Sequence, residues 1–181
     1  MKIYVIGGKA NCGKSTLGED LKEELKDYGY KPCVMHITEP LYTYARRYFE
    51  WNEEDPKPRE FLQKVGIEII KEKMGKKEFL LNRLYEDIEI LSNFFDTFII
   101  TDARLKEEFE GIKNHYEDVV TIKLVRRNYE SVLTKEEEQH ITETDIDNIE
   151  EFDYEIENKG IEDLKLKALE IIRNEEKDGG E

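Results

Sequence analysis

Short apolar runs alternate along this chain with longer segments in which apolar residues recur every three or four positions. The short runs predict strands, because strands buried on both faces of a parallel sheet are apolar throughout. The longer segments have the spacing of one helical face, as at Phe61, Leu62, Val65 and Ile69. The predicted strands cover residues 2–7, 33–37, 97–101, 119–125 and 154–156.

Helical patterns fill the intervals between these strands. They cover residues 14–28, 41–49, 59–74, 77–93, 106–115, 129–138 and 161–173. Alternating strands and helices predict an α/β fold, a five-stranded parallel sheet with helices on both faces in three layers. Ligands of such sheets bind at the carboxyl ends of the strands. Gly8, Glu39, Asp102 and Arg126 all follow predicted strands, so we expect them in one site.

The first strand is followed by a loop that matches G-x-x-x-x-G-K-[ST] in every position, from Gly8 to Ser15. A strand, a glycine loop and a helix in this order form a cradle for nucleotide phosphates. We therefore expect the backbone amides of this loop to bind the phosphates of a nucleoside triphosphate. The expected nucleotide-binding residues are Gly8, Asn11, Cys12, Gly13, Lys14, Ser15 and Thr16.

Three side chains of the loop have more specific expectations. Lys14 is expected to reach the β- and γ-phosphates from an exposed position, and the Ser15 hydroxyl to hold Mg²⁺. Cys12 is expected to be an incidental thiol that alkylating reagents reach. A tight strand-to-helix turn without a ligand is the structural alternative for the whole loop.

A second group of candidate residues follows the apolar run at 97–101. Asp102 is expected to contact Mg²⁺ or orient the acceptor, and Arg104 to pair with a transferring phosphoryl group. The alternatives are a carboxylate that caps the next helix and an arginine in an ordinary ion pair. The N-K-x-D signature by which GTPases read their base does not occur in the sequence.

Charge and composition exclude several classes of partner. The 43 acidic and 28 basic residues give a net charge of −15, a field that repels nucleic acid and anionic lipid. With only two cysteines, a disulfide scaffold is not expected. No apolar stretch approaches the roughly 18 residues of a membrane span. We therefore expect a cytoplasmic protein, a monomer or homodimer, without nucleic acid or membrane partners.

Several segments in order along the chain resemble the deoxynucleoside monophosphate kinase family of P-loop kinases. Its motifs are similar to GGKANCGKST at 7–16, REFLQKVGIEI at 59–69, ITDARLKEE at 100–108 and HITE at 140–143. The segment FDYEIENKGIEDL at 152–164 is similar to the last strand, turn and helix of the family. The helix that begins at Arg59 and the T-D-x-R strand end are the discriminating motifs.

The resemblance implies transfer of the ATP γ-phosphoryl group to a nucleoside monophosphate, with Mg²⁺. It implies that Arg59 binds the acceptor phosphate, that Gln63 binds its base, and that Asp102 and Arg104 lie between the two nucleotides. Arg126 or Arg127 would lie beside ATP, where a planar guanidinium can stack. Arg46, and with it Arg47, is a further candidate for the acceptor phosphate, although arginines on a helix are more often surface charges.

The same resemblance divides the chain. It implies one P-loop kinase domain over about 1–175, with a helical acceptor-binding region at about 39–95 and a lid-like segment at about 128–147. The charged and glycine-containing end of the sequence predicts a flexible tail at 176–181.

The chain departs from the family in its lid, which usually carries arginines. Here the segment is acidic, and Lys135 is its only Lys or Arg. His140 within it is expected to be exposed, either as a solvated or helix-capping side chain or with a role in lid closure. Leu105 and Lys106 stand where the family usually has proline and asparagine.

Aromatic residues precede the acceptor region, at Tyr42, Tyr44, Phe49 and Trp51. Such spacing favours core packing over a sandwich around a nucleobase.

The sequence leaves two alternatives to a nucleoside monophosphate kinase. One is a P-loop kinase for another small molecule. The other is a regulatory or assembly protein that binds a nucleotide with little catalysis, which the acidic lid would suit.

Overall fold

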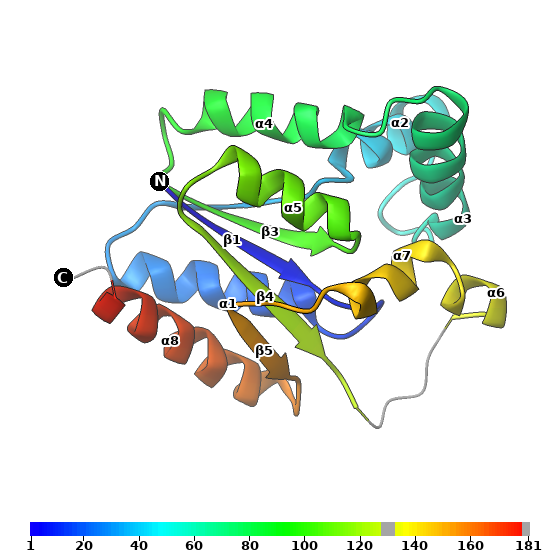
Figure 1. Cartoon of the computed structure of the whole chain (residues 1–181). Coiled ribbons are helices and arrows are strands. Elements are labelled where there is room, and N and C mark those ends of the chain that lie inside the picture. Colours follow the sequence, from blue (N-terminus) through cyan, green and yellow to red (C-terminus); the bar gives the residue numbers. More distant parts are fainter. Residues whose placement is uncertain (128–132, 179–181) are drawn as a thin grey trace. The chain divides into compact units, whose positions relative to one another are not determined.

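The computed structural model describes residues 1–127 and 133–178 of the chain (Figure 1). They form two compact units, which are described separately below. The sheet unit comprises Met1–Met35 and Leu91–Glu181, and the helical unit comprises His36–Ile90.

The sheet unit is built on five parallel strands in the order β2-β3-β1-β4-β5. These strands are β1 (Lys2–Gly7), β2 (Pro32–Met35), β3 (Thr97–Ala103), β4 (Val119–Val125) and β5 (Tyr154–Glu157). The predicted five-stranded parallel sheet is therefore confirmed, with small differences at the strand ends.

The register of the sheet brings three strand ends to one edge. Gly7, the last residue of β1, is opposite Ala103 of β3 and Lys123 of β4. The pairing with β3 shifts between Val5 and Gly7, where β1 begins to leave the sheet. The loops that follow β1, β3 and β4 therefore start side by side.

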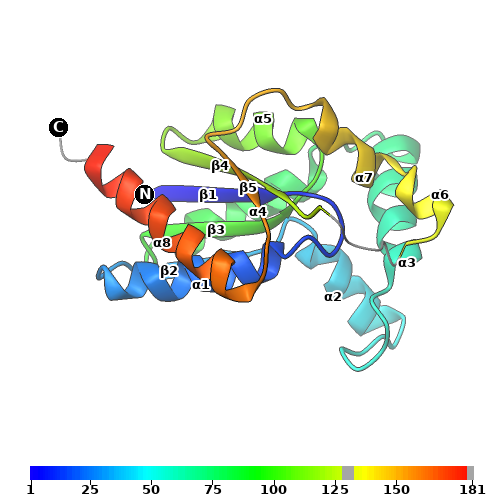
Figure 2. The ribbon, with the colours of Figure 1, turned by 90° about the horizontal axis from the view of Figure 1, so that it is seen from below.

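Three long helices cover the sheet: α1 (Lys14–Asp27), α5 (Lys106–His115) and α8 (Ile161–Asp178). Figure 2 shows α1 and α8 on one face and α5 on the other. Buried apolar residues hold α1 and α8 on their face of the sheet. Tyr4 and Ile6 of β1 pack with Leu17 and Leu21 of α1 in one apolar cluster, to which Ile171 of α8 also belongs.

Close packing of α1 on the sheet depends on a glycine. A Cβ atom at Gly18 would lie 2.4 Å from the Cγ2 atom of Thr101. Only glycine lets α1 approach β3 this closely without displacing that buried threonine.

Short helical turns complete the sheet unit after β4. They are α6 (Lys135–Glu138), α7 (Ile141–Thr144) and the 3-10 turn η2 (Asp145–Asn148). The helix predicted at 129–138 is therefore seen only from Lys135, and residues 128–132 lie outside the described part of the chain. Helix α8 runs on to Asp178, so the first residues of the expected flexible tail are helical; residues 179–181 are not described.

The helical unit contains α2 (Glu39–Tyr48), α3 (Arg59–Gln63), η1 (Lys64–Lys73) and most of α4 (Phe79–Leu91). The single α-helix predicted at 59–74 is α-helical only as far as Gln63 and continues as the π-helix η1. At its end the Met74 N–H donates to the Ile69 carbonyl at 2.8 Å, five residues back. Apolar spacing predicts a helix here but does not distinguish the wider π turn from the α turn.

Within the described residues, no helix is long and apolar enough to cross a membrane.

Candidate active site

The loop between β1 and α1 has the backbone conformation expected of a phosphate cradle. Gly8, Asn11 and Gly13 all have positive φ, of 151°, 56° and 106°. A Cβ atom at Gly8 would lie 2.4 Å from the Leu124 carbonyl oxygen, and one at Gly13 would lie 2.6 Å from Asn158 Nδ2. Both glycines of the motif are thus required by conformation and by space.

Lys14 folds back onto its own loop. Its Nζ atom donates to the carbonyl oxygens of Gly8 and Lys9, both at 2.7 Å, and lies 3.8 Å from Cys12 Sγ. The residue is only 8% exposed, which corrects the expectation of an exposed lysine. Helix α1 begins at Lys14, and Ser15 and Thr16 in its first turn are exposed.

Cys12 differs from its sequence-based expectation. The residue is 3% exposed and packs in the cluster that contains Leu17 and Leu164. Its burial contradicts the expectation that alkylating reagents reach this thiol in the folded protein.

Two residues from the β4 and β5 ends hold the middle of the loop. Arg126 Nη1 donates to the Asn11 carbonyl at 3.4 Å, and Asn158 Nδ2 donates to the Cys12 carbonyl at 2.7 Å. The Asn158 N–H in turn donates to the Val125 carbonyl at 2.7 Å. Arg127 has a different environment: its side chain is 70% exposed and its Nε lies 3.9 Å from a Glu157 carboxylate oxygen. Of the two candidate arginines, Arg126 is therefore the one in contact with the phosphate loop.

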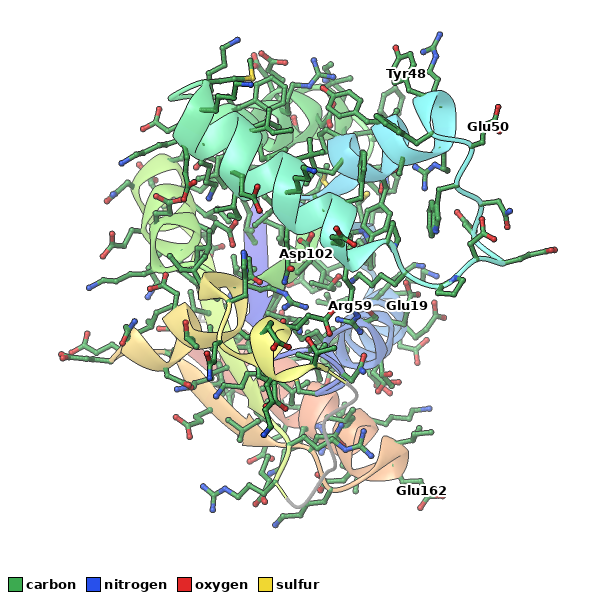
Figure 3. All side chains as sticks on the ribbon, turned by 90° about the vertical axis from the view of Figure 1, so that its right-hand side faces the viewer. Glu19, Tyr48, Glu50, Arg59, Asp102 and Glu162 are labelled. Atoms are coloured by element: carbon green, nitrogen blue, oxygen red, sulfur yellow. The ribbon has the colours of Figure 1, made fainter. Side chains whose placement is uncertain are left out.

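Asp102 and Arg104 lie at the end of β3, beside the start of the loop (Figure 3 labels Asp102). Asp102 is half-buried within the strand, and the residue before α5 is Leu105, so Asp102 is not the capping residue of that helix. Arg104 forms an ion pair with Glu143 of α7 and also donates to the Thr142 carbonyl at 3.4 Å. In this structure Arg104 is therefore in an ion pair, as its alternative interpretation expected.

Glu143 joins this arginine to the phosphate loop. One of its carboxylate oxygens pairs with Arg104, and the other accepts the Ala10 N–H at 2.7 Å. The Glu143 residue is 4% exposed, which is rare for a glutamate unless it is paired.

Further acidic contacts attach the α7–η2 segment to the same edge of the sheet unit. Asp145 accepts the Lys106 N–H at 2.6 Å, and Asp147 pairs with Lys9 Nζ at 2.6 Å. His140 caps α7, with its Nδ1 atom accepting the Thr142 N–H at 3.3 Å, as one of its two interpretations expected. Three acidic residues of the expected lid, Glu143, Asp145 and Asp147, therefore contact the loop or the start of α5.

The remaining predicted site residues belong to the helical unit. Arg59 and Gln63 are the first and last residues of α3 and are partly buried. Being four apart, they share one face of that helix. Arg46 on α2 pairs with Glu39 and lies 3.7 Å from Glu53, which is the surface-charge environment of its alternative interpretation.

The aromatic residues around α2 are not core residues. Tyr48 and Phe49 are each 66% exposed, and Tyr48 projects from the end of α2 in Figure 3. Phe49 and Phe61 have ring centroids 4.9 Å apart, and Tyr42 and Trp51 have centroids 5.5 Å apart. The expectation of core packing is therefore wrong for Phe49, whereas Tyr42, Tyr44 and Trp51 are half-buried.

Two residues that contact the loop were not singled out from the sequence. Glu143 and Asn158 both lie in segments that resemble family motifs, HITE and ENKG. Glutamate and asparagine are common in surface segments, so the residue type alone did not indicate contacts with Ala10 and Cys12, more than a hundred positions away. The family motifs were the only sequence signal that could have identified them.

Metal binding here would depend on the nucleotide as well as the protein. Across residues 1–127 and 133–178, no group of three or more His, Cys, Asp or Glu side chains could hold a metal ion. Ser15 and Asp102 offer oxygen ligands, the type that Mg²⁺ prefers, and Mg²⁺ usually keeps waters and phosphate oxygens as well. The donor set thus fits a magnesium ion that arrives with phosphates.

No protein-family model and no curated protein matches the chain. Among solved structures, it is similar to the APS kinase CysC of Mycobacterium tuberculosis in complex with AMPPNP and APS, with a TM-score of 0.59 and 13% identity over 95% of each chain. It is also similar to shikimate kinase from Aquifex aeolicus, with a TM-score of 0.50 and 16% identity over 97% of this chain and 98% of that one.

At these identities the similarity establishes the fold and not the substrate. Both proteins are kinases. The chain shares with them an α/β fold, in which a five-stranded parallel sheet carries a glycine loop between β1 and α1.

Proposed function

We propose that this protein is a nucleoside or deoxynucleoside monophosphate kinase, which transfers the γ-phosphoryl group of ATP to the monophosphate with Mg²⁺. The observation that carries the phosphoryl-transfer part is the loop Gly8–Ser15, with its three positive φ angles and its buried lysine. Loops of this kind bind phosphates through backbone N–H groups at a helix N-terminus.

The residues of the sheet unit have complementary roles in this proposal. The amides from Asn11 to Ser15 would bind the ATP phosphates, and Lys14 would exchange its contacts with Gly8 and Lys9 for phosphate oxygens. Ser15 and Asp102 would hold Mg²⁺, which neutralises charge that develops on the transferred group. Arg126, already at the Asn11 carbonyl, would lie beside ATP.

The helical unit would supply the acceptor site. Arg59 and Gln63 share a face of α3, so a guanidinium and an amide side chain would act together on one acceptor. A guanidinium binds a phosphate with two parallel hydrogen bonds, and an amide can both donate to and accept from a base. Asp102 and Arg104 would act on the phosphoryl group during in-line transfer, by positioning and by charge.

A P-loop kinase for another small molecule is the first alternative. It is supported by the similar structures, because these are kinases of other small molecules, APS and shikimate. The resemblance of α3 to the monophosphate kinase helix favours a nucleoside monophosphate as the acceptor over these.

A nucleotide-binding protein with little catalysis is the second alternative. It is favoured by the ion pair between Arg104 and Glu143, which offsets a positive charge that the transfer of a phosphoryl group would use. The proposed kinase requires that the Arg104 guanidinium, which has five N–H donors, also donates to the phosphoryl group.

The experiment that tests the proposal is a coupled ADP-release assay with ATP and Mg²⁺. Acceptors are all common ribo- and deoxyribonucleoside monophosphates, with adenylyl sulfate, shikimate and common sugars as the comparison set. We expect stimulation by one or a few monophosphates and none by the comparison set. Stimulation by a comparison acceptor alone would replace the proposal by the first alternative, and ATP binding without any stimulation by the second.

The proposed cellular setting follows from charge and composition. We expect an enzyme without nucleic acid or anionic membrane partners, because the net charge of −15 repels polyanions. With only two cysteines the chain fits the cytoplasm, and we expect a monomer or homodimer.

A further inference from the structure

We propose that Glu143 is a positioning residue, which holds the Arg104 guanidinium beside the loop Gly8–Ser15. In this position Arg104 and the loop would both act on the transferring phosphoryl group. This inference rests on the proposed phosphoryl transfer and concerns a residue outside the predicted catalytic set.

The contacts of the Glu143 carboxylate define the role. Its two oxygens have different partners, the Arg104 guanidinium and the Ala10 N–H at 2.7 Å. These partners belong to two different segments, the turn after β3 and the loop after β1. A single carboxylate therefore sets the position of a cationic side chain relative to the phosphate cradle.

Burial makes this link stable. The side chains of Glu143 and Arg104 are 4% and 18% exposed, so water competes little for their hydrogen bonds. Removing one member of such a pair leaves the other charge poorly solvated, which is costly. The pair is therefore expected to stay together when a nucleotide binds.

The backbone at Arg104 is fixed as well. A Glu108 carboxylate oxygen accepts the N–H groups of Arg104 and Leu105, at 2.8 and 3.0 Å. With Glu143 and the Thr142 carbonyl at the other end of the side chain, the arginine is held at both ends. Little orientational freedom remains to be lost when the guanidinium meets a phosphoryl oxygen, which is how preorganised groups lower a barrier.

The contact with Ala10 lies in the first half of the loop, ahead of the amides that lead into α1. Lys9 in this half is bound to Asp147 of the same α7–η2 segment. The second half, from Asn11 to Lys14, carries the positive φ angles of Asn11 and Gly13. Glu143 thus occupies the Ala10 N–H in the first half of the loop and makes no contact with the amides from Asn11 to Ser15 that would bind phosphate.

The test compares Glu143→Gln with the wild type in steady-state transfer. Glutamine has one acceptor and one donor end, so whichever way its amide turns, a donor faces either Arg104 or the Ala10 N–H. We expect kcat to fall about 10- to 100-fold, the range for a misplaced catalytic group. The KM for ATP is expected to change by less than about threefold, because uniform binding is retained.

A double-mutant cycle with Arg104→Ala separates positioning from general damage. If Glu143 acts through Arg104, the double variant has about the same kcat as Arg104→Ala alone. Losses that multiply in the double variant would overturn the proposal. So would a wild-type kcat in Glu143→Gln, or tighter ATP binding, which would mean that Glu143 competes with phosphate.

Two further variants keep the test decisive. Asp147→Asn removes an exposed ion pair from the same segment, between side chains 53% and 57% exposed, and is expected to change kcat by less than about twofold. If Glu143→Gln does not fold, Glu143→Asp keeps the charge but is too short to reach both partners, and a wild-type kcat in that variant would overturn the proposal.

The identity of the acceptor is tested separately, by the reaction of the wild-type protein. If the wild type transfers to another acceptor, or only to water, the same variants are compared on that reaction. A wild type that neither transfers nor hydrolyses ATP would overturn both proposals.

Discussion

At the scale of single residues, the site depends on a few side chains with little freedom. Lys14 is buried and bonded to its own loop, and Arg104 is held by Glu143. The sequence motif predicted which residues would be in the loop and where glycine was needed. It did not predict the resting contacts of Lys14, because these form with carbonyl groups that every residue has.

Replacing Lys14 with methionine is expected to abolish phosphoryl transfer. Methionine fills much of the buried volume but offers no donor to a phosphate or to the Gly8 and Lys9 carbonyls. The lost hydrogen bonds predict a destabilisation of about 1–3 kcal/mol, the usual range for charged donors. The ADP-release assay and urea unfolding measure the two effects, and wild-type turnover in Lys14→Met would remove the loop from the mechanism.

Replacing Asp102 with asparagine is expected to lower kcat by at least about tenfold at saturating Mg²⁺, because an amide is a poor substitute for a carboxylate near a metal. The isosteric change in a half-buried strand residue should leave the thermal midpoint within about 2 °C. A Mg²⁺ titration of both proteins checks this, and an unchanged rate at every concentration would exclude Asp102 from the reaction.

At the scale of secondary-structure elements, periodicity predicted most of the fold. Each predicted strand is present, since short apolar runs such as residues 97–101 have few other ways to be buried on both faces. The π-helix η1 was not predicted, because its apolar spacing also fits an α-helix. The attachment of α7 and η2 was missed because acidic residues in a polar segment normally indicate solvent exposure.

The contact between α1 and β3 gives a prediction at this scale. Gly18→Ala should destabilise the protein by about 1–3 kcal/mol, because the new methyl group would overlap Thr101 Cγ2, 2.4 Å away. Helix propensity opposes this by no more than about 1 kcal/mol.

A second substitution tests the cause. Thr101→Ser removes the methyl group that the alanine would meet, so the double variant should regain much of the loss of Gly18→Ala. Chemical unfolding of the wild type, the two single variants and the double variant gives the four free energies of unfolding that the double-mutant cycle needs. A double variant whose losses simply add would show that overlap with Thr101 is not the reason.

The link between β4 and β5 is expected to depend on pH. The pKa of Asp153 is raised by burial, but hydrogen bonds from the Thr121 hydroxyl and N–H, with Lys113 nearby, outweigh this, and the pKa is lowered from 3.8. A lowered pKa contributes stability above the unfolded value, and this stability is lost as the pH falls through the folded value.

Asp153→Asn is accordingly expected to destabilise the protein at pH 7 by about 1 kcal/mol, a modest figure because the side chain is 46% exposed. The difference from the wild type should shrink as the pH falls below 3.8. Urea unfolding at pH 7 and at pH 3 compares them; an equal difference at both would contradict this account of Asp153.

At the scale of the whole molecule, the chain combines a sheet unit that carries the phosphate loop with a helical unit that carries Arg59 and Gln63. The sequence predicted both groups of residues. Their joint action on one acceptor stays a prediction. The net charge of −15 makes the positive charge of Lys14, Arg59, Arg104 and Arg126 more important for any anionic ligand.

The central claim is that this molecule moves the γ-phosphoryl group of ATP to a nucleoside monophosphate. The most direct measurement follows the labelled γ-phosphoryl group from ATP in a mixture of nucleoside monophosphates and identifies the labelled products. The account predicts label in one or a few nucleoside diphosphates, formed in step with ADP and absent with Lys14→Met. Label that stays in ATP, or appears only in inorganic phosphate, would contradict it.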